Sequence, residues 1–433
     1  MASRPHRIVV VGGGAGGLEL ATRLGDKLAR RGRAHVTLVD RSRTHLWKPL
    51  LHEVAAGSID IHDHQLDFLA QAMWHRFTFV LGALCALDRA AREVVVAAVR
   101  DDEGREILPE RRVPYDTLVI AVGSESNDFG TPGVRDFAFT IDNPWQANLF
   151  HRRLVNECFR ANYANDGAVL PLAIVGAGAT GVELAAEMHN TTRVLAAFGL
   201  EHFDPERQIR ISVIEAGPRI LPGLPEYLAQ ETDRVLAKLG VHVLVNEKVV
   251  EVTPDAVKTA ADHEVPSRFT IWAAGIRCPA VLATLGLETN RLNQLVVRAT
   301  LQVPLDDAIF ALGDCAAAPW KEGRRVPPRA QAAHQEASHL VKSIERIMAG
   351  RPPKPFRYQD FGSLVSLGNY QSVGTLMGFA TGGTLRVEGL LAKIFYISLY
   401  RMHVWALHGF WGMALDTLAR MIRRQTHPRV KLH

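Results

Sequence analysis

The sequence contains two glycine-rich turns of the form GxGxxG, each placed between an apolar strand and a helix. Before the second turn, residues 172–175 form an apolar run, and an Ala/Leu/Glu-rich stretch follows the glycines at once. This order suits a dinucleotide because glycines let a pyrophosphate approach the backbone, and the helix N-terminus offers free N–H groups and a positive dipole end. The glycines that carry this prediction are Gly176, Gly178 and Gly181.

The first turn has the same plan near the start of the chain. The run RIVVV at residues 7–11 leads into Gly12, Gly14 and Gly17, and the next strand ends in Asp40. Asp40 falls close to the spacing expected of a dinucleotide fingerprint. Two complete dinucleotide sites in one chain indicate that electrons pass between the two ligands.

An acidic residue also ends the strand that follows the second turn. The strand at residues 211–214 is followed by Glu215. A carboxylate at this place hydrogen-bonds a ribose 2′-hydroxyl and repels a 2′-phosphate. The second site therefore favours NADH over NADPH.

Further residues at strand ends and in loops are candidates for contact with the two dinucleotides. Strands at residues 115–122 and 269–273 end in small residues, and a third strand, at residues 309–312, ends in Gly-Asp. The aspartate of that Gly-Asp pair either accepts a hydrogen bond from a sugar-alcohol chain such as that of FAD or caps the next helix. A lysine in the loop after the first acid either reaches the cofactor or is solvated. These candidates are Lys48, Gly123, Ala274, Gly275, Gly313 and Asp314.

A helix that starts after Pro327 and Pro328 carries two glutamines four residues apart. Prolines set the start of a helix, and the spacing places Gln331 and Gln335 on one face. Their amides can hydrogen-bond a carbonyl acceptor beside a flavin without adding charge. The alternative is a pair of surface glutamines on an ordinary helix.

These patterns predict an α/β protein with two Rossmann-like dinucleotide-binding domains, the second inserted in the first. We expect residues 1–160 and 291–345 to form the first domain and residues 161–290 the second. Residues 346–433 would add a small β layer and amphipathic, membrane-associating helices.

The membrane prediction rests on the tail at residues 390–424. Large apolar residues recur there every three or four positions from Ile397 to Ile422, which traces one helical face. The longest charge-free run, between Arg401 and Asp416, is too short to span a bilayer, which needs about 20 residues. A helix lying in the interface of an anionic membrane fits better, and the alternative is a buried helix of a soluble homodimer. Aromatic and basic residues support the interface: Trp405, Phe410, Trp411, Arg420, Arg423, Arg424, Arg429 and Lys431.

Charge and cysteine content narrow the remaining choices. The net charge of +5 is compatible with an anionic membrane or with nucleic acid and decides neither. The four cysteines have no C-x-x-C pair and no metal-ligand spacing, so we expect no metal and a reducing setting. The first residues lead straight into a core strand, so we expect no signal peptide.

With these residues in view, the whole chain resembles the type II (non-proton-pumping) NADH:quinone oxidoreductases, two-dinucleotide-domain flavoproteins. The resemblance rests on GAGATGVELAAE, WAAGI, ALGDCA and PPRAQAAHQEA. It implies one FAD, held by Gly12, Gly14, Gly17, Asp40 and Asp314. It implies NADH on Gly176, Gly178, Gly181, Glu183 and Glu215. Gln331 and Gln335 would lie beside the isoalloxazine ring at the quinone site, and Glu183 near the junction of nicotinamide and flavin.

The reaction that this resemblance implies is hydride transfer from NADH to FAD, then two electrons to a membrane quinone without proton pumping. The enzyme would sit peripherally on the cytoplasmic face of the cell membrane, attached through its tail, with no nucleic acid as partner. A sulfide:quinone oxidoreductase is the first alternative, but it works through paired cysteines at the flavin. The second is a slow NADH-binding redox sensor with a basic surface that docks nucleic acid.

Overall fold

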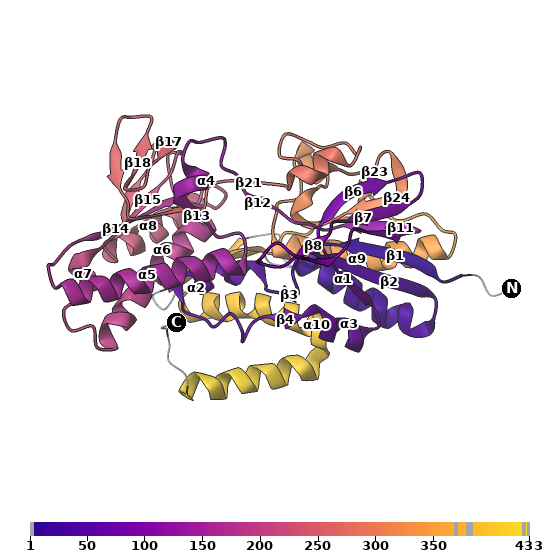
Figure 1. The fold of residues 1–433 in the computed structure, drawn as a ribbon, viewed down its shortest axis with the longest axis horizontal. Helices are drawn as coiled ribbons and strands as arrows, with labels where there is room; N and C mark the ends of the chain where they lie inside the picture. Colours follow the sequence, from indigo (N-terminus) through magenta and orange to yellow (C-terminus); the bar gives the residue numbers. More distant parts are fainter. Residues whose placement is uncertain (1–3, 368–370, 378–383, 427–429, 431–433) are drawn as a thin grey trace.

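Two parallel β-sheets with helices packed against them form the two halves of the molecule (Figure 1). The structure is a computed structural model that describes residues 4–367, 371–377, 384–426 and 430. Both sheets are built from apolar runs whose side chains are buried on both faces, as parallel strands covered by helices require. The fold is therefore α/β, as the sequence predicts.

The first sheet has six strands in the order β23-β24-β11-β1-β2-β5, and every pairing except β23–β24 is parallel. Helix α1 (Ala15–Lys27) begins directly after the first glycine turn and packs against α9 (Ala330–Met348). The strands are β1 (His6–Val11), β2 (Ala34–Asp40), β5 (Thr78–Leu81), β11 (Thr117–Ile120), β23 (Gln302–Val303) and β24 (Asp306–Ala311).

The second sheet has five parallel strands in the order β13-β20-β14-β15-β16. Helix α6 (Ala179–Ala197) begins after the second glycine turn, and α5 (Pro144–Ala164) packs into the same core. Helix α8 (Glu226–Lys238) leads to the edge strand. The strands are β13 (Ala138–Thr140), β14 (Leu170–Val175), β15 (Ile209–Ile214), β16 (His242–Leu244) and β20 (Phe269–Trp272).

Each half also carries a three-stranded antiparallel sheet at the same point in its chain order. The sheet β10-β7-β6 stands between β5 and β11, and β17-β18-β19 stands between β16 and β20. The two halves thus repeat one architecture, as the paired fingerprints indicate. The strands are β6 (Leu84–Asp88), β7 (Glu93–Val96), β10 (Arg111–Pro114), β17 (Val249–Val252), β18 (Ala256–Thr259) and β19 (Glu264–Pro266).

The chain crosses between the halves twice, on a two-stranded antiparallel ribbon. Strand β12 (Glu125–Ser126) leads out of the first half and pairs with β21 (Ile276–Arg277), which leads back. The boundaries expected after residues 160 and 290 differ from these crossings. Strand β13 belongs to the second sheet and α5 packs in the core of that half, whereas apolar residues between 278 and 287 pack in the core of the first half. We therefore propose residues 127–275 as the inserted domain.

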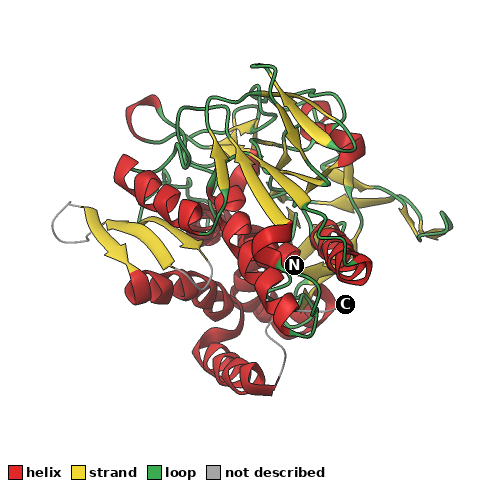
Figure 2. Cartoon of the chain, turned by 90° about the vertical axis from the view of Figure 1, so that its left-hand side faces the viewer, coloured by secondary structure: helices red, strands yellow, loops and turns green. Residues whose placement is uncertain are grey.

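The C-terminal region adds an antiparallel sheet and one broken helix. Strands β26 (Gly362–Leu367), β27 (Gln371–Met377) and β28 (Thr384–Glu388) are followed by α10 (Gly389–Thr426). The helix breaks at Gly409, whose φ of 70° and ψ of 177° are not helical. Figure 2 shows the part after the break as the lowest helix of the view, set apart from the helices above it.

This break divides the apolar face that the sequence suggests is continuous. Before it, Val404 and Leu407 are buried against the protein. After it, Trp411 and Leu415 are 77% and 66% exposed. Arg429 and Lys431, expected to add positive charge, lie outside the described residues. In the part of the chain that the structure describes, no helix has the length and apolar character needed to cross a membrane.

Short elements complete the fold between these larger units. They connect the sheets or lie at their edges: β3 (Thr44–His45), α2 (Leu51–Ala56), β4 (Leu66–Asp67), α3 (Phe68–His75), β8 (Val99–Arg100), β9 (Glu106–Leu108), α4 (Val134–Phe137), α7 (Pro205–Gln208), β22 (Leu295–Val296) and β25 (Ala316–Ala317).

Candidate active site and dinucleotide sites

The first position of each turn must be glycine because the end of a neighbouring strand lies directly against it. Gly12 and Gly176 have φ values of +105° and +102°, a region that side chains rarely adopt. A Cβ on Gly12 would lie 2.3 Å from the Ala121 oxygen, and one on Gly176 would lie 2.7 Å from the Ala274 Cα. The small residues at the ends of β11 and β20 therefore pass directly against the two turns.

The other two glycines of each turn have different tasks. A Cβ on Gly17 or Gly181 would lie 1.8 or 2.0 Å from the oxygen of the first glycine, so these positions let the helix pack on the turn. A Cβ on Gly14 or Gly178 would meet nothing within 4 Å. Both residues are helix N-caps with no side-chain capping bond, so open space and backbone N–H groups coincide. This is the cradle that a pyrophosphate fits.

The two acids at the strand ends make the same pair of hydrogen bonds. Asp40 accepts from the N–H of Gly13 at 2.6 Å and of Ser42 at 2.7 Å. Glu215 accepts from the N–H of Ala177 at 2.9 Å and of Gly217 at 2.8 Å. Each carboxylate is thereby fixed beside its own glycine turn, where a fingerprint acid must lie to meet a ribose.

Four of the predicted FAD contacts gather beside β24, namely Lys48, Gly123, Gly313 and Asp314. The Ser124 hydroxyl donates to Asp314 Oδ2 at 2.6 Å, and Lys48 Nζ donates to the Ser124 carbonyl at 2.7 Å. Gly123, next to this serine, has a φ of +72°. Three chain segments, around Lys48, Ser124 and Asp314, thus bring their polar groups to the end of the first sheet. These residues and the open cradle at Gly14 fit an FAD that extends from the first glycine turn.

The two glutamines of α9 bind the segment that leads into β26. Gln331 donates to the Gly362 carbonyl at 2.9 Å and accepts from the Phe361 N–H at 3.2 Å. Gln335 donates to the Gln359 carbonyl at 2.8 Å and accepts from the N–H of the same residue at 3.0 Å. The amides share one side of the helix, as expected, and hold backbone there. Their contact with a quinone stays a prediction.

Glu183 lies in the second turn of α6 and is buried. Its Oε1 accepts from the Ser366 N–H of β26 at 3.0 Å, and its Oε2 lies 3.7 Å from Nδ1 of His52. Burial raises the pKa of Glu183 to about 8 and lowers the pKa of His52 to about 4. Near neutral pH the pair is therefore an uncharged carboxyl beside an uncharged imidazole, and Glu183 can donate a proton.

Two buried groups beside the first turn escaped the sequence interpretation. Glu336 Oε2 accepts from the Gly313 N–H at 2.6 Å, and burial raises the pKa of Glu336 to about 8. His45 Nδ1 lies 2.8 Å from the Gly13 oxygen. Glu336 follows Gln335 directly in the sequence, but nothing in the local pattern indicates that its side chain reaches Gly313, 23 residues earlier at the end of a strand.

The cysteines do not form a reactive pair among the described residues. All four are free, and burial raises the pKa of Cys158 and Cys315 to about 12. Cys315 Sγ donates to backbone carbonyls and Cys278 Sγ to the Asp314 carbonyl, as packing thiols do. Since the thiolate is the reactive form, these thiols do not suit the chemistry of the sulfide:quinone alternative.

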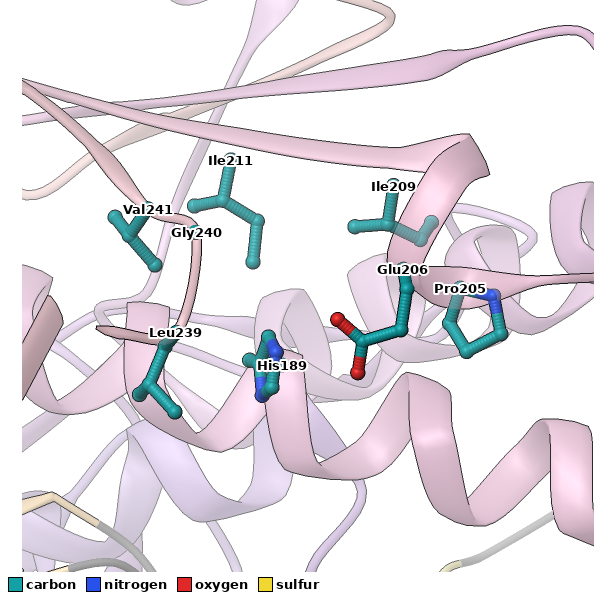
Figure 3. Close-up of a pocket in the computed structure, with 8 residues that line it drawn as sticks. All are labelled: His189, Pro205, Glu206, Ile209, Ile211, Leu239, Gly240 and Val241. Atoms are coloured by element: carbon teal, nitrogen blue, oxygen red, sulfur yellow. The ribbon is translucent and has the colours of Figure 1, made fainter. Parts of the chain in front are cut away.

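A cavity in the second half lies away from the dinucleotide turn. It has a volume of about 50 Å³, and Figure 3 shows His189 of α6 and Glu206 facing each other across it. Ile209, at the start of β15, also lines it, so the cavity lies toward the amino end of that strand. Dinucleotides bind at the carboxyl ends of parallel strands, so this cavity belongs to neither site.

Comparison with known proteins defines the class of the chain. Residues 6–337 match the family model described as pyridine nucleotide-disulphide oxidoreductase. The matched region holds both glycine turns and the start of α9, including Gln331 and Gln335. The chain therefore belongs to this family, which confirms a pyridine nucleotide as one of the two predicted ligands.

Within that family, the chain belongs to the type II NADH:quinone oxidoreductases. It is 43% identical over 443 residues to the type II NADH:quinone oxidoreductase of Haemophilus influenzae, covering 98% of this chain and 99% of that protein. The NDH2 of Plasmodium falciparum, solved in complex with NADH, superposes with a TM-score of 0.81 at 19% identity, covering 99% and 100%. The sulfide:quinone oxidoreductase of Aquifex aeolicus gives a TM-score of 0.73 at 19% identity, covering 98% and 96%. These matches confirm the predicted family, fold class and enzyme class.

Proposed function

We propose that this protein carries out the reaction that its family name describes, oxidation of NADH with a quinone as electron acceptor, through a bound FAD. The observation that carries the proposal is the pair of equivalent turns. Each combines an open glycine, an uncapped helix N-terminus and a carboxylate fixed beside it. One turn serves FAD and the other NADH, because an enzyme of this class passes electrons between two ligands.

The first half holds FAD through the groups that surround its turn. Gly12, Gly14 and Gly17 give the pyrophosphate its approach to the N-terminus of α1, and Asp40 meets the ribose. Asp314 accepts from Ser124 and from the sugar-alcohol chain. FAD, when bound, supplies a centre that accepts a hydride and releases two electrons.

The second half holds NADH on Gly176, Gly178 and Gly181. Glu215 binds the ribose 2′-hydroxyl and excludes a 2′-phosphate through its charge. Ala274 and Gly275 complete the site at the end of β20, where the Ala274 backbone passes against Gly176. The protein's contribution here is orientation of the nicotinamide and exclusion of competing ligands.

Quinone binding is assigned to the N-terminal part of α9 and to β26. Gln331 binds the first residue of β26, Gly362, and Glu183 binds Ser366 in the same strand. Strand β26 thus links Gln331 to the buried acid of α6, and Gln335 binds Gln359 in the segment just before that strand. We assign the glutamine amides to positioning the quinone carbonyl, and Glu183 to supplying a proton as the quinone is reduced.

A two-stage kinetic experiment on the holoenzyme tests this assignment. NADH first reduces the cofactor in the absence of quinone, and a short-chain quinone is then added. We expect Gln335→Leu to keep the first rate and to lower the second on the order of a hundredfold. Gln230→Leu, on the exposed side of α8, is the matched control. A Gln335→Leu enzyme that reduces quinone at the unmodified rate would remove the quinone assignment.

The part of α10 after Gly409 supports attachment to an anionic membrane. Asp416 pairs with Arg401 of the first part at 2.7 Å and with Arg420 at 2.8 Å, which turns the polar side of this helix inward. The apolar side faces outward: Trp411, Leu415, Leu418, Met421 and Ile422. An exposed apolar helix face of this kind suits a lipid interface. We place the enzyme on the cytoplasmic face, and a homodimer stays a prediction.

A further inference from the structure

A second apolar surface lies on α3, far in sequence from the tail. Leu69, Met73 and Trp74 are 66%, 77% and 54% exposed, three large apolar side chains on an eight-residue helix. We refer to these three residues as the α3 patch. A surface helix normally turns polar residues to solvent, so an outward apolar face marks an interaction site.

The outward direction of the α3 patch is fixed by the rest of the helix. Asp67 caps it by accepting from the N–H of Leu69 and Ala70, at 2.8 and 3.1 Å. Phe68, Gln71 and Ala72 are buried on the inner side. Because the cap and the buried inner side fix the orientation of the helix, Leu69 and Met73 cannot turn toward the core.

The patch adjoins α10 at its break. Gln71 Nε2 lies 3.4 Å from Nε2 of His408, and the rings of Trp74 and His408 meet edge to face with centroids 6.1 Å apart. Gly409 follows His408, so the outward-facing part of α10 starts here, and Figure 1 shows α3 beside this end of the helix. Phe410 and Trp411, 54% and 77% exposed, continue the apolar surface from the patch onto the tail.

Exposed arginines lie at the C-terminal end of α3 and in the turn that contacts it. Arg76 follows the helix directly, and Arg30 donates from Nη2 to the Trp74 carbonyl at 2.9 Å. Arg31 and Arg33, in the same turn as Arg30, are also exposed. Of the nearby acids, Asp26 pairs with Arg30 and His75, and the Asp67 carboxylate is used by the cap. With Arg30 offset by Asp26, the excess positive charge at this end of the helix comes from Arg76 and from Arg31 and Arg33 beside Arg30 in the chain.

We propose that the α3 patch is a second membrane contact, in which Leu69, Met73 and Trp74 enter the interface and the nearby exposed arginines bind anionic lipid headgroups. This inference rests on the membrane attachment of α10 proposed above and gives it a second anchor from the FAD-binding half. Apolar side chains next to basic residues match a bilayer whose surface is negative. Two anchors on separate elements also fix how the enzyme is oriented on the surface, which a single helix does not.

Flotation of the holoenzyme with lipid vesicles tests the proposal. The vesicles are phosphatidylcholine with and without phosphatidylglycerol, and the readout is the partition coefficient. We expect Leu69→Ser/Met73→Ser to lower partition at least roughly tenfold on both lipids, because two apolar side chains leave the interface. We expect Arg31→Gln/Arg33→Gln to lower partition by roughly fivefold or more only with phosphatidylglycerol present.

Two further variants serve as controls. One tests whether any pair of exposed apolar residues affects partition, and the other removes the contact made by the tail. Phe159→Ser/Tyr163→Ser removes two exposed apolar residues of α5, which lies in the other half, and should leave partition unchanged. Leu415→Ser/Leu418→Ser removes the tail contact and should lower partition. Unchanged partition of the α3 variant, with the tail variant reduced, overturns the second anchor and keeps the first.

Two additional measurements, sedimentation and vesicle-free NADH oxidation, distinguish failure of the second anchor from failure of the proposed function. A change in sedimentation coefficient of the α3 variant with unchanged partition would make the patch a contact between copies and overturn the proposal. Oxidation of NADH with a short-chain quinone, measured without vesicles, reports the proposed function by itself. That activity should be the same in wild type and in Leu69→Ser/Met73→Ser, whatever the partition shows.

Discussion

His403 of α10 and His45 of β3 share a hydrogen bond, Nε2 to Nε2, at 2.9 Å. His45 continues the connection through Nδ1 to the oxygen of Gly13, in the first glycine turn, at 2.8 Å. Both rings are buried, and Trp47 stacks on His403. The C-terminal helix is therefore joined to the predicted FAD turn through one imidazole. Because Nδ1 of His45 donates to the Gly13 oxygen, Nε2 of a neutral His45 accepts from Nε2 of His403, so the contact is lost when both rings are protonated.

The histidine pair predicts a loss of stability in acid. Burial lowers the pKa of His45 from 6.5 to about 4, and lowers that of His403 well below its usual value. The unfolded chain therefore binds more protons as the pH falls from 6.5 towards 4, and the free energy of unfolding decreases over that window. For His45 alone the full effect is roughly 3 kcal/mol.

Thermal unfolding of the holoenzyme across this window checks the prediction. His403→Gln keeps a donor for His45 but cannot be protonated, so we expect its stability to fall less steeply with acid than that of wild type. His62→Gln, at an exposed position, is the control. Equal pH dependence in wild type and His403→Gln would show that the pair does not govern acid stability.

The second glycine turn predicts two different outcomes for one added methyl group. A Cβ at residue 178 meets no protein atom, so we expect Gly178→Ala to fold with unchanged melting temperature and to bind NADH at least about tenfold more weakly, or 1.4 kcal/mol. A Cβ at residue 181 would lie 2.0 Å from the Gly176 oxygen. Gly181→Ala should therefore lose about 2 kcal/mol of stability. Unfolding and NADH titration distinguish the two, and normal NADH affinity in Gly178→Ala would contradict the cradle.

The charge of Glu215 predicts the choice between nucleotides. Glu215→Gln keeps an oxygen to accept from one of the two backbone N–H groups but removes the repulsion of a 2′-phosphate. We expect kcat/KM with NADPH, relative to NADH, to rise by about tenfold. Glu226→Gln, on the surface of α8, is the control. An unchanged ratio would place the determinant of specificity elsewhere.

The raised pKa of Glu183 predicts the pH dependence of quinone reduction. The carboxyl is neutral below about pH 8 and can donate, so quinone turnover should fall as the pH rises through about 8. Glu183→Gln should lower quinone turnover on the order of a hundredfold and abolish this pH step, while reduction of the cofactor by NADH is retained. A pH profile that keeps the step in Glu183→Gln would assign it to another group, with Glu336 the next candidate.

The glycine turns were predictable because their constraints are local. Strand, glycines and helix follow one another within twenty residues, and a Cβ on Gly17 would clash within its own turn, with the Gly12 oxygen. The acids Asp40 and Glu215 follow from their positions at the ends of the next apolar strands. Sequence therefore located both glycine turns, which have matching geometries in the structure.

Relationships that depend on tertiary placement were not predictable. Nothing in a three-residue strand such as β13 indicates which sheet it joins, so the domain crossing was expected too late in the chain. Apolar spacing along the tail does not show that the helix breaks at Gly409. The expected face is therefore divided, with Val404 and Leu407 buried before the break and Trp411 and Leu415 exposed after it. His45 and His403 are 358 residues apart, and only the fold brings them together.

The most direct measurement is NADH oxidation by the purified holoenzyme with a short-chain quinone, with NADPH in parallel. We expect rapid quinone-dependent turnover with NADH, and little with NADPH because of Glu215. A cofactor that NADH reduces but that no quinone reoxidises would contradict the central claim. That result would leave the two dinucleotide sites in place and favour a slow, NADH-binding sensor instead.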